Sequence, residues 1–261
     1  MARRPEALRR YTTRRHLRHV LVLAFLFAIV WVLAAIAPNH RSDWALENVL
    51  TIIIVPILVG TYYRFPLSRV SYTLIFVFLC LHTIGSHYTY AEVPYSEWSE
   101  AIFGISINEF FGWDRNHYDR LIHFFYGLLI AYPIREIYLR IANVRGFWGY
   151  ALPVSFAMAS SLTYELLEWA AAMVFGGDLG VAYLGTQGDS WDAQKDMSLA
   201  ASGALIAMFV TAFLNYRYQR DFAREWSESL QVKHPAPLGE VRFQRLKSLA
   251  ARRPKRRPAR K

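Results

Sequence analysis

The chain has 261 residues, of which 54% are hydrophobic and 16% are aromatic, and its net charge is +10. The one cysteine, Cys80, excludes an internal disulfide, and we expect it to be a core residue. Charged residues make up 19% of the chain and gather in the tails and between long apolar runs, as is typical of a polytopic membrane protein. We therefore attribute the positive charge to membrane topology and do not expect a nucleic-acid partner.

Six apolar runs are each close to the roughly 20 residues that a helix needs to cross a bilayer. The runs lie at residues 20–37, 44–63, 70–87, 118–138, 148–175 and 197–216. They predict an all-α fold, namely a polytopic membrane helical bundle with six transmembrane helices in one domain over residues 20–218. A basic segment, residues 1–19, precedes this domain, and a basic, largely disordered tail, residues 219–261, follows it.

The basic residues are divided unequally between the two sides that six spans would create. The segments on one side hold 25 of the 30 basic residues and five acidic ones, and they are residues 1–19, 64–69, 139–148 and 217–261. The loops on the other side hold three basic and ten acidic residues, and they are residues 38–43, 88–116 and 176–196. By the positive-inside rule, both termini are cytoplasmic and the acidic loops face outward.

The tail ends in a basic run punctuated by prolines, residues 251–261. Such a run cannot build a core, and we expect it to bind the anionic lipids of the inner leaflet, while the bundle itself contacts the bilayer. Residues 238–249 are weakly amphipathic and predict a short surface helix. The sequence does not indicate an oligomeric state.

Ionisable residues occur in the outer halves of four predicted spans, where a charge needs a partner. Asp119 and His123 are four residues apart, so they share one face of a helix. The other acids and imidazoles at this level are His82, Glu165, Glu168, Asp192 and Asp196. From the helical rise of 1.5 Å per residue, His82, His123 and Glu168 each lie about 10 Å below the outer boundary. We therefore predict one outward-facing polar site, in which Arg120 pairs with a carboxylate.

This set of side chains suits two kinds of chemistry. Carboxylates and imidazoles on facing helices are ligands for a divalent metal such as zinc, manganese or iron. The predicted metal ligands are His82, His123, Glu168, Asp192 and Asp196. The same groups suit general acid and base catalysis, for which the predicted residues are Asp119, His123, Glu165 and Glu168. No H-E-x-x-H or E-x-x-H motif is present, so the sequence leaves the presence and identity of a metal open.

Three functions remain open at this point. The leading hypothesis is a metal-dependent enzyme that acts on a lipid-linked or envelope substrate. A transporter or proton-coupled carrier is an alternative, but the inner halves of these spans offer only Arg135 and Glu136 to continue a polar path. A second alternative is a non-catalytic membrane scaffold whose polar cluster holds the helices together.

The polar segments resemble the YjdF-like family of bacterial inner-membrane proteins, which has no assigned reaction. The resembling segments are residues 82–90, 118–124, 164–168, 185–189 and 192–197. The most specific of them is Gly185-Thr186-Gln187-Gly188-Asp189, within a loop, residues 183–196, that we expect to cap the site from outside. The resemblance covers residues 20–218 and implies a multi-pass protein of the bacterial inner membrane.

A looser similarity concerns the order of the acidic motifs. Asp-x3-His, then Glu-x2-Glu, then an Asp at the start of the last span with Gly203 seven residues later, is similar to VanZ-like membrane proteins. That family is linked to glycopeptide-antibiotic tolerance. Its members tend to have Asn at the position of Ala200 and often Gln at that of Glu168.

Overall fold

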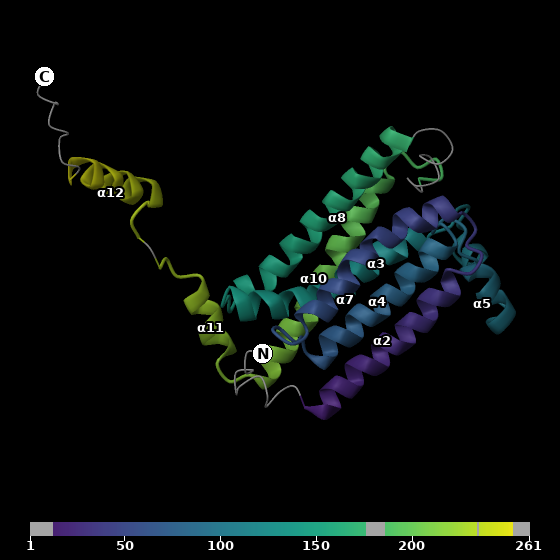
Figure 1. Ribbon diagram of the computed structural model, residues 1–261, viewed down its shortest axis with the longest axis horizontal. Helices are drawn as coiled ribbons and strands as arrows, with labels where there is room; N and C mark the ends of the chain where they lie inside the picture. The colour runs from purple at the N-terminus through teal and green to yellow at the C-terminus, as the bar shows by residue number, and fades with distance from the viewer. Residues whose placement is uncertain (1–12, 176–185, 234, 253–261) are drawn as a thin grey trace, which may run out of the picture.

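The computed structural model describes residues 13–175, 186–233 and 235–252. Within these residues it has ten helices and no strand, so the predicted all-α class is confirmed. The membrane-length helices are α2 (Arg14–Ala34), α3 (Arg41–Thr61), α4 (Arg69–His87), α7 (Tyr118–Ile141), α8 (Trp148–Phe175) and α10 (Asp192–Tyr218) (Figure 1). The shorter helices are α5 (Tyr95–Phe103), α6 (Ile107–Phe111), α11 (Phe222–Ser229) and α12 (Leu238–Arg252).

Four of the described helices are long and apolar enough to cross a membrane, and these are α2, α3, α4 and α10. They correspond to the predicted spans at residues 20–37, 44–63, 70–87 and 197–216. Helices α7 and α8 match the other two predicted spans in position but do not belong to this set. The sixfold count of spans therefore stays a prediction.

Helix α7 lies at the centre of the bundle and packs against α4, α8 and α10. Helices α2 and α3 both pack against α4. In Figure 1 the long helices run side by side, with α2 at one edge of the bundle and α8 at the other. Cys80 is partly buried in α4 against an apolar cluster that includes Ile75 and Leu79. Three helices thus present side chains to α7, which starts with the predicted site residues.

The contact between α7 and α10 is a seam of small residues, which we call the glycine seam. It consists of Gly127, Ala131, Ala200, Gly203 and Ala204, and the three alanines are at most 1% exposed. Such residues let two helix backbones approach closely, which is how helices associate where lipid replaces water. Both helices begin at the end where Arg120 contacts Asp192, so they run parallel and bring their first turns together.

The tail contains two helices. Helix α11 packs Phe222 and Trp226 against Tyr150 near the start of α8. Helix α12 contains the predicted surface helix at residues 238–249 and lies apart from the bundle in Figure 1. The sequence predicted a largely disordered tail from residue 219, whereas the structure has helix at 222–229 and 238–252. The basic runs at 1–12 and 253–261 lie outside the described residues.

Candidate functional site

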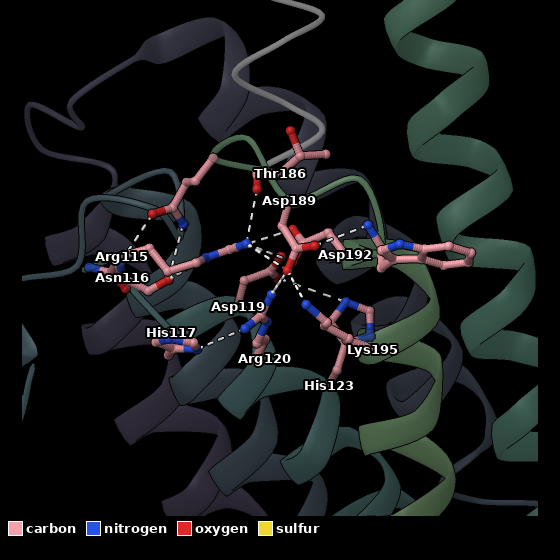
Figure 2. Close-up of polar contacts among 12 residues, drawn as sticks. Arg115, Asn116, His117, Asp119, Arg120, His123, Thr186, Asp189, Asp192 and Lys195 are labelled. Carbon is pink, nitrogen blue, oxygen red and sulfur yellow. Dashed lines mark hydrogen bonds and ion pairs between the residues drawn. The ribbon is translucent and has the colours of Figure 1, made fainter. Parts of the chain in front are cut away.

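Two arginines and two aspartates close the end of the bundle at which α7 and α10 begin, and we call this group the arginine clamp. It consists of Arg115, Arg120, Asp189 and Asp192. Arg115 donates to both carboxylate oxygens of Asp192 at 2.9 and 3.1 Å, in a bidentate geometry that a lysine cannot reproduce. Arg120 donates to Asp192 at 2.8 Å and also to Asp189. Figure 2 shows both guanidinium groups converging on Asp192, so the predicted ion pair of Arg120 is confirmed.

The clamp holds two loops against each other. Arg115 donates to the backbone carbonyl of Thr186 at 2.9 Å. The side-chain amide of Gln187 pairs with the backbone of Asn116, accepting from its N–H and donating to its carbonyl, both at 3.0 Å. These contacts place residues 186–189 over the site, at the end of the bundle where α7 begins, and we call these residues the cap. Residues 183–185 of the predicted cap lie outside the described residues.

Asp189 anchors the cap through its charge. The Lys195 ammonium and the backbone N–H of Trp191 both donate to this carboxylate, and Arg120 adds a third contact. Hydrogen bonding from Lys195, then from Trp191, therefore holds the pKa of Asp189 well below its usual range. The side chain is 18% exposed, so the charge is partly screened by solvent.

Beneath the clamp lies a buried group of acids around one imidazole, which we call the acidic cluster. It consists of Asp119, His123, Glu165, Glu168 and Asp196. Asp119, His123 and Asp196 each offer one ligand atom, and these three atoms all lie within 4.8 Å of one another. His123 Nε2 lies 3.7 Å from Asp119 Oδ1 and 3.4 Å from Glu165 Oε1. Figure 2 shows Asp119 and His123 below Asp189 and Asp192.

The separations of 3.4 and 3.7 Å from His123 Nε2 are close to those between two ligands of one ion and longer than hydrogen bonds. Two ligand atoms of a tetrahedral ion with bonds of 2.0 to 2.2 Å are about 3.3 to 3.6 Å apart, whereas a strong hydrogen bond is shorter than about 3.2 Å. Asp196 Oδ1 and Glu165 Oε1 are buried and have no hydrogen-bond partner among the described residues. On the other side of the ring, His123 Nδ1 lies 3.5 Å from the hydroxyl of Ser161.

The acidic cluster carries more negative charge than the nearby cations offset. Glu168 is 7% exposed, and Asp119, Glu165 and Asp196 all act on it as like charges. Burying several carboxylates together is unfavourable unless a cation or protons compensate for them. The two arginines nearest the cluster already bind aspartates of the clamp. The chemistry of this donor set therefore fits a divalent cation.

A cavity of about 130 Å³ opens beside the acidic cluster, and we call it the site cavity. Asp119 and His123 form part of its wall. The remaining lining combines apolar side chains with hydroxyls and one further imidazole, and it consists of Leu50, Phe78, His82, Tyr90, Ile122, Tyr126, Ser160, Ser161 and Tyr164. A cavity of about this volume can hold a group the size of a benzene ring. A small apolar or amphipathic group can therefore reach the cluster.

His82 belongs to the wall of the site cavity and not to the group of ligand atoms. Its Nε2–H donates to the backbone carbonyl of Glu47 at 3.1 Å, so its Nδ1 accepts from the hydroxyl of Tyr90. The chain returns Tyr90 to this place through positive φ angles at Thr89 and Tyr90. Gly85 makes room for the ring, because a Cβ there would lie 2.5 Å from it.

The structure adds residues that the sequence analysis missed. Glu47 of α3 is 6% exposed and accepts from the hydroxyl of Tyr164 at 2.9 Å. Because Glu47 lies inside the apolar run at 44–63, the sequence could have indicated that it needs a partner within the protein. Arg115 lies in the loop before α7, and its partners, Thr186 and Asp192, are more than 70 residues further along the chain. Tyr90 ends the resembling segment 82–90, but the sequence did not indicate that its hydroxyl contacts His82.

Comparison with known proteins places the chain in a family. The sequence profile of a family described as "Predicted membrane protein (DUF2238)" matches residues 19–217. This chain belongs to that family. A relative from Escherichia coli (strain K12), named "Inner membrane protein YjdF", is 38% identical over 200 residues, which cover 76% of this chain and 91% of the relative. No solved structure matches.

The family match confirms the resemblance to YjdF-like proteins. It also agrees with the apolar helices, so the protein is a multi-pass protein of the inner membrane. The matched region contains all the residues of the acidic cluster and the arginine clamp. Its bundle contacts the lipid bilayer.

Proposed function

We propose that this protein is a membrane metalloenzyme whose acidic cluster binds one divalent metal ion at the outward-facing end of the bundle. The proposed ligands are Asp119, His123 and Asp196, whose ligand atoms lie within 4.8 Å of one another, and they leave the fourth position of the ion open. His82 is left out because both ring nitrogens have protein partners, and Asp192 because two arginines bind it. Glu168 then serves, with Glu165, as an acid or base next to the ion.

One observation favours a catalytic role over a structural one. Asp119 and His123 each contribute one of the grouped ligand atoms, and both also line the site cavity. A structural metal site is closed by its ligands, whereas a catalytic site keeps one position open to a substrate. The apolar part of the cavity wall suits a lipid-linked or envelope substrate. The metal would supply Lewis acidity or an activated water at that position.

The proposed topology has six spans, with both termini in the cytoplasm. Helices α7 and α8 have 24 and 28 residues, which at 1.5 Å per residue exceed the ~30 Å hydrocarbon core. Three of the charges that lower the hydropathy of α7, those of Arg120, Glu136 and Arg140, are paired inside the protein. Arg120 binds the clamp, and Glu136 accepts from Ser68, Ser71 and Arg140.

Transport is disfavoured by the closed seam below the cluster. A relay would have to continue from His123 along α7 to Glu136. The residues between them on the α10 side are Gly127 and Ala131, sealed by Ala200 and Ala204. The Glu136 carboxylate already accepts hydrogen bonds from Arg140 and from Ser68 and Ser71 at the start of α4.

The experiment compares cells that lack the protein with cells that regain it as wild type or as His123→Gln. Lipids and envelope components are extracted and compared by mass spectrometry. The proposal expects one species to accumulate both without the protein and with His123→Gln, because the ligand is lost. Restoration of the normal profile by His123→Gln would contradict it. The scaffold alternative predicts that Glu165→Gln lowers the unfolding temperature while leaving this profile normal.

A further inference from the structure

An apolar groove runs along the other side of the bundle, between α2 and α3 and over α4. Its volume is about 220 Å³, and we call it the inner groove. Its lining is apolar apart from three tyrosines, and it consists of Leu17, Val20, Leu21, Leu23, Ala24, Phe27, Val55, Leu58, Val59, Tyr62, Tyr63, Tyr72, Ile75, Phe76 and Leu79. Several of these side chains remain exposed, among them Leu21, Val59 and Tyr63. The groove is therefore open on its lipid-facing side.

The length of the groove corresponds to one leaflet. Its wall on α2 extends from Leu17 to Phe27, which is about 15 Å at 1.5 Å per residue. This is half of the ~30 Å hydrocarbon core. The groove's end is fixed by His16, whose Nε2–H donates to the Leu67 carbonyl at 2.9 Å and whose Nδ1 accepts from Tyr62 at 3.0 Å. This buried imidazole ties the start of α2 to the end of α3.

The same end of the groove carries positive charge. Five exposed arginines flank the lining residues in sequence, and they are Arg14, Arg15, Arg18, Arg64 and Arg69. No aspartate or glutamate occurs in residues 13–42 or 48–91, and Glu136, which reaches the start of α4 from α7, is already paired with Arg140. The inner groove is thus about one leaflet long and has arginines at one end, which we call its cationic rim. Because lipid tails are as apolar as the groove, binding selectivity must come from the head group at this rim.

We infer that the inner groove is a binding site for an anionic glycerophospholipid of the arginine-rich side of the membrane. One acyl chain lies between α2 and α3, and the phosphate group lies among the arginines. This site is distinct from the proposed metal site, which lies at the opposite end of the bundle, and from the basic tail. The lipid fills a gap that the contacts of α2 and α3 with α4 leave open.

The test is native mass spectrometry of the full chain in detergent, titrated with phosphatidylglycerol or phosphatidylcholine. Wild type is expected to bind phosphatidylglycerol preferentially. Arg18→Gln with Arg64→Gln should lower that preference by about 25-fold, at roughly fivefold per arginine. The matched control removes two exposed arginines near the end of α10, Arg217→Gln with Arg220→Gln, and should keep it.

A second pair of variants tests the groove itself. Ala24 lines the groove, whereas Ala28, one turn further along α2, does not line it and is also exposed. Ala24→Trp should abolish the bound lipid, and Ala28→Trp should retain it. Unchanged lipid binding in Ala24→Trp, or unchanged head-group preference in the double arginine variant, would overturn the inference. Loss of a dimer in Ala24→Trp without loss of lipid would instead identify an interface between copies. Metal content is expected to be the same in all these variants, which separates this test from that of the metal site.

Discussion

Gly127 of α7 and Gly203 of α10 each face the backbone of the other helix. A Cβ built on Gly127 would lie 1.9 Å from the carbonyl oxygen of Ala200, and one on Gly203 would lie 2.1 Å from that of Phe124. Helix backbones this close leave no space for any side chain. The contact fixes the register of the two helices, and therefore the meeting of Asp119 and His123 with Asp196 one to two turns nearer the start of both helices.

Gly127→Ala is therefore expected to force the two helices apart. Overpacking of a closely packed contact typically destabilises by about 1 to 3 kcal/mol, and the clash with backbone places this variant at the upper end. The measurement is the free energy of unfolding in detergent. Gly60→Ala is the control, because nothing lies within 4 Å of a Cβ there and alanine favours the helix by up to about 1 kcal/mol. Equal free energies of unfolding for the two variants would contradict the close packing of α7 against α10 at Gly127.

Arg115→Ala is expected to destabilise the protein by about 2 to 3 kcal/mol, because it removes two charge-assisted hydrogen bonds to a nearly buried carboxylate. Arg115→Lys should recover less than half of this loss, since it cannot form the bidentate pair. Arg145→Ala is the control, with a side chain 68% exposed and its nearest acid, Glu225, at 4.0 Å. That pair should contribute less than about 1 kcal/mol. A loss in Arg145→Ala as large as in Arg115→Ala would contradict the clamp.

The pKa of Asp189 predicts how the cap responds to acid. Because the folded pKa is depressed below the ordinary value of 3.8, its contribution is fully present above that value and is lost as pH falls toward the folded pKa. The stability difference between wild type and Asp189→Asn should therefore be constant from pH 7 to about pH 5 and shrink below about pH 4. Unfolding measured across this range tests it. A difference that grows on acidification would mean that the carboxylate is not held in its charged form.

The six-span topology predicts that loops on either side of α7 and α8 alternate between membrane faces. In a Cys80→Ser background, single cysteines are introduced as Asp114→Cys, Arg145→Cys or Ser190→Cys, at three exposed positions. A maleimide that cannot cross the membrane should label the first and third in intact cells, and Arg145→Cys only after lysis. Labelling of all three in intact cells would show that α7 and α8 do not span.

Much of the fold could be predicted because apolar length alone defines membrane helices. The predicted span at 148–175 has the same bounds as α8, and that at 118–138 begins where α7 begins. Pro133 and Pro153 lie inside α7 and α8 without ending these helices. Helical spacing predicted that Asp119 and His123 share one helix face, and the structure brings a ligand atom of each within 4.8 Å of one on Asp196.

The rest depended on which helix faces which, and the sequence pattern does not state that. The predicted metal ligands included His82 and Asp192. In the structure, His82 forms hydrogen bonds with Tyr90 and Glu47, and Asp192 accepts hydrogen bonds from Arg115. Their partners come from a tight turn and from a loop, whose positions follow from tertiary contacts. The glycine seam, which decides the rotation of α7 against α10, is indicated in the sequence only by isolated small residues.

Metal binding by the acidic cluster is tested most directly by the metal content of the purified protein, measured for zinc, manganese and iron by mass spectrometry. Wild type should hold about one ion per chain, and Asp119→Asn and Asp196→Asn about one tenth of that or less. Glu136→Gln, which removes a carboxylate at the far end of α7, is the matched control and should retain the ion. Absence of metal from wild type, or equal content in Asp196→Asn and wild type, would contradict the account.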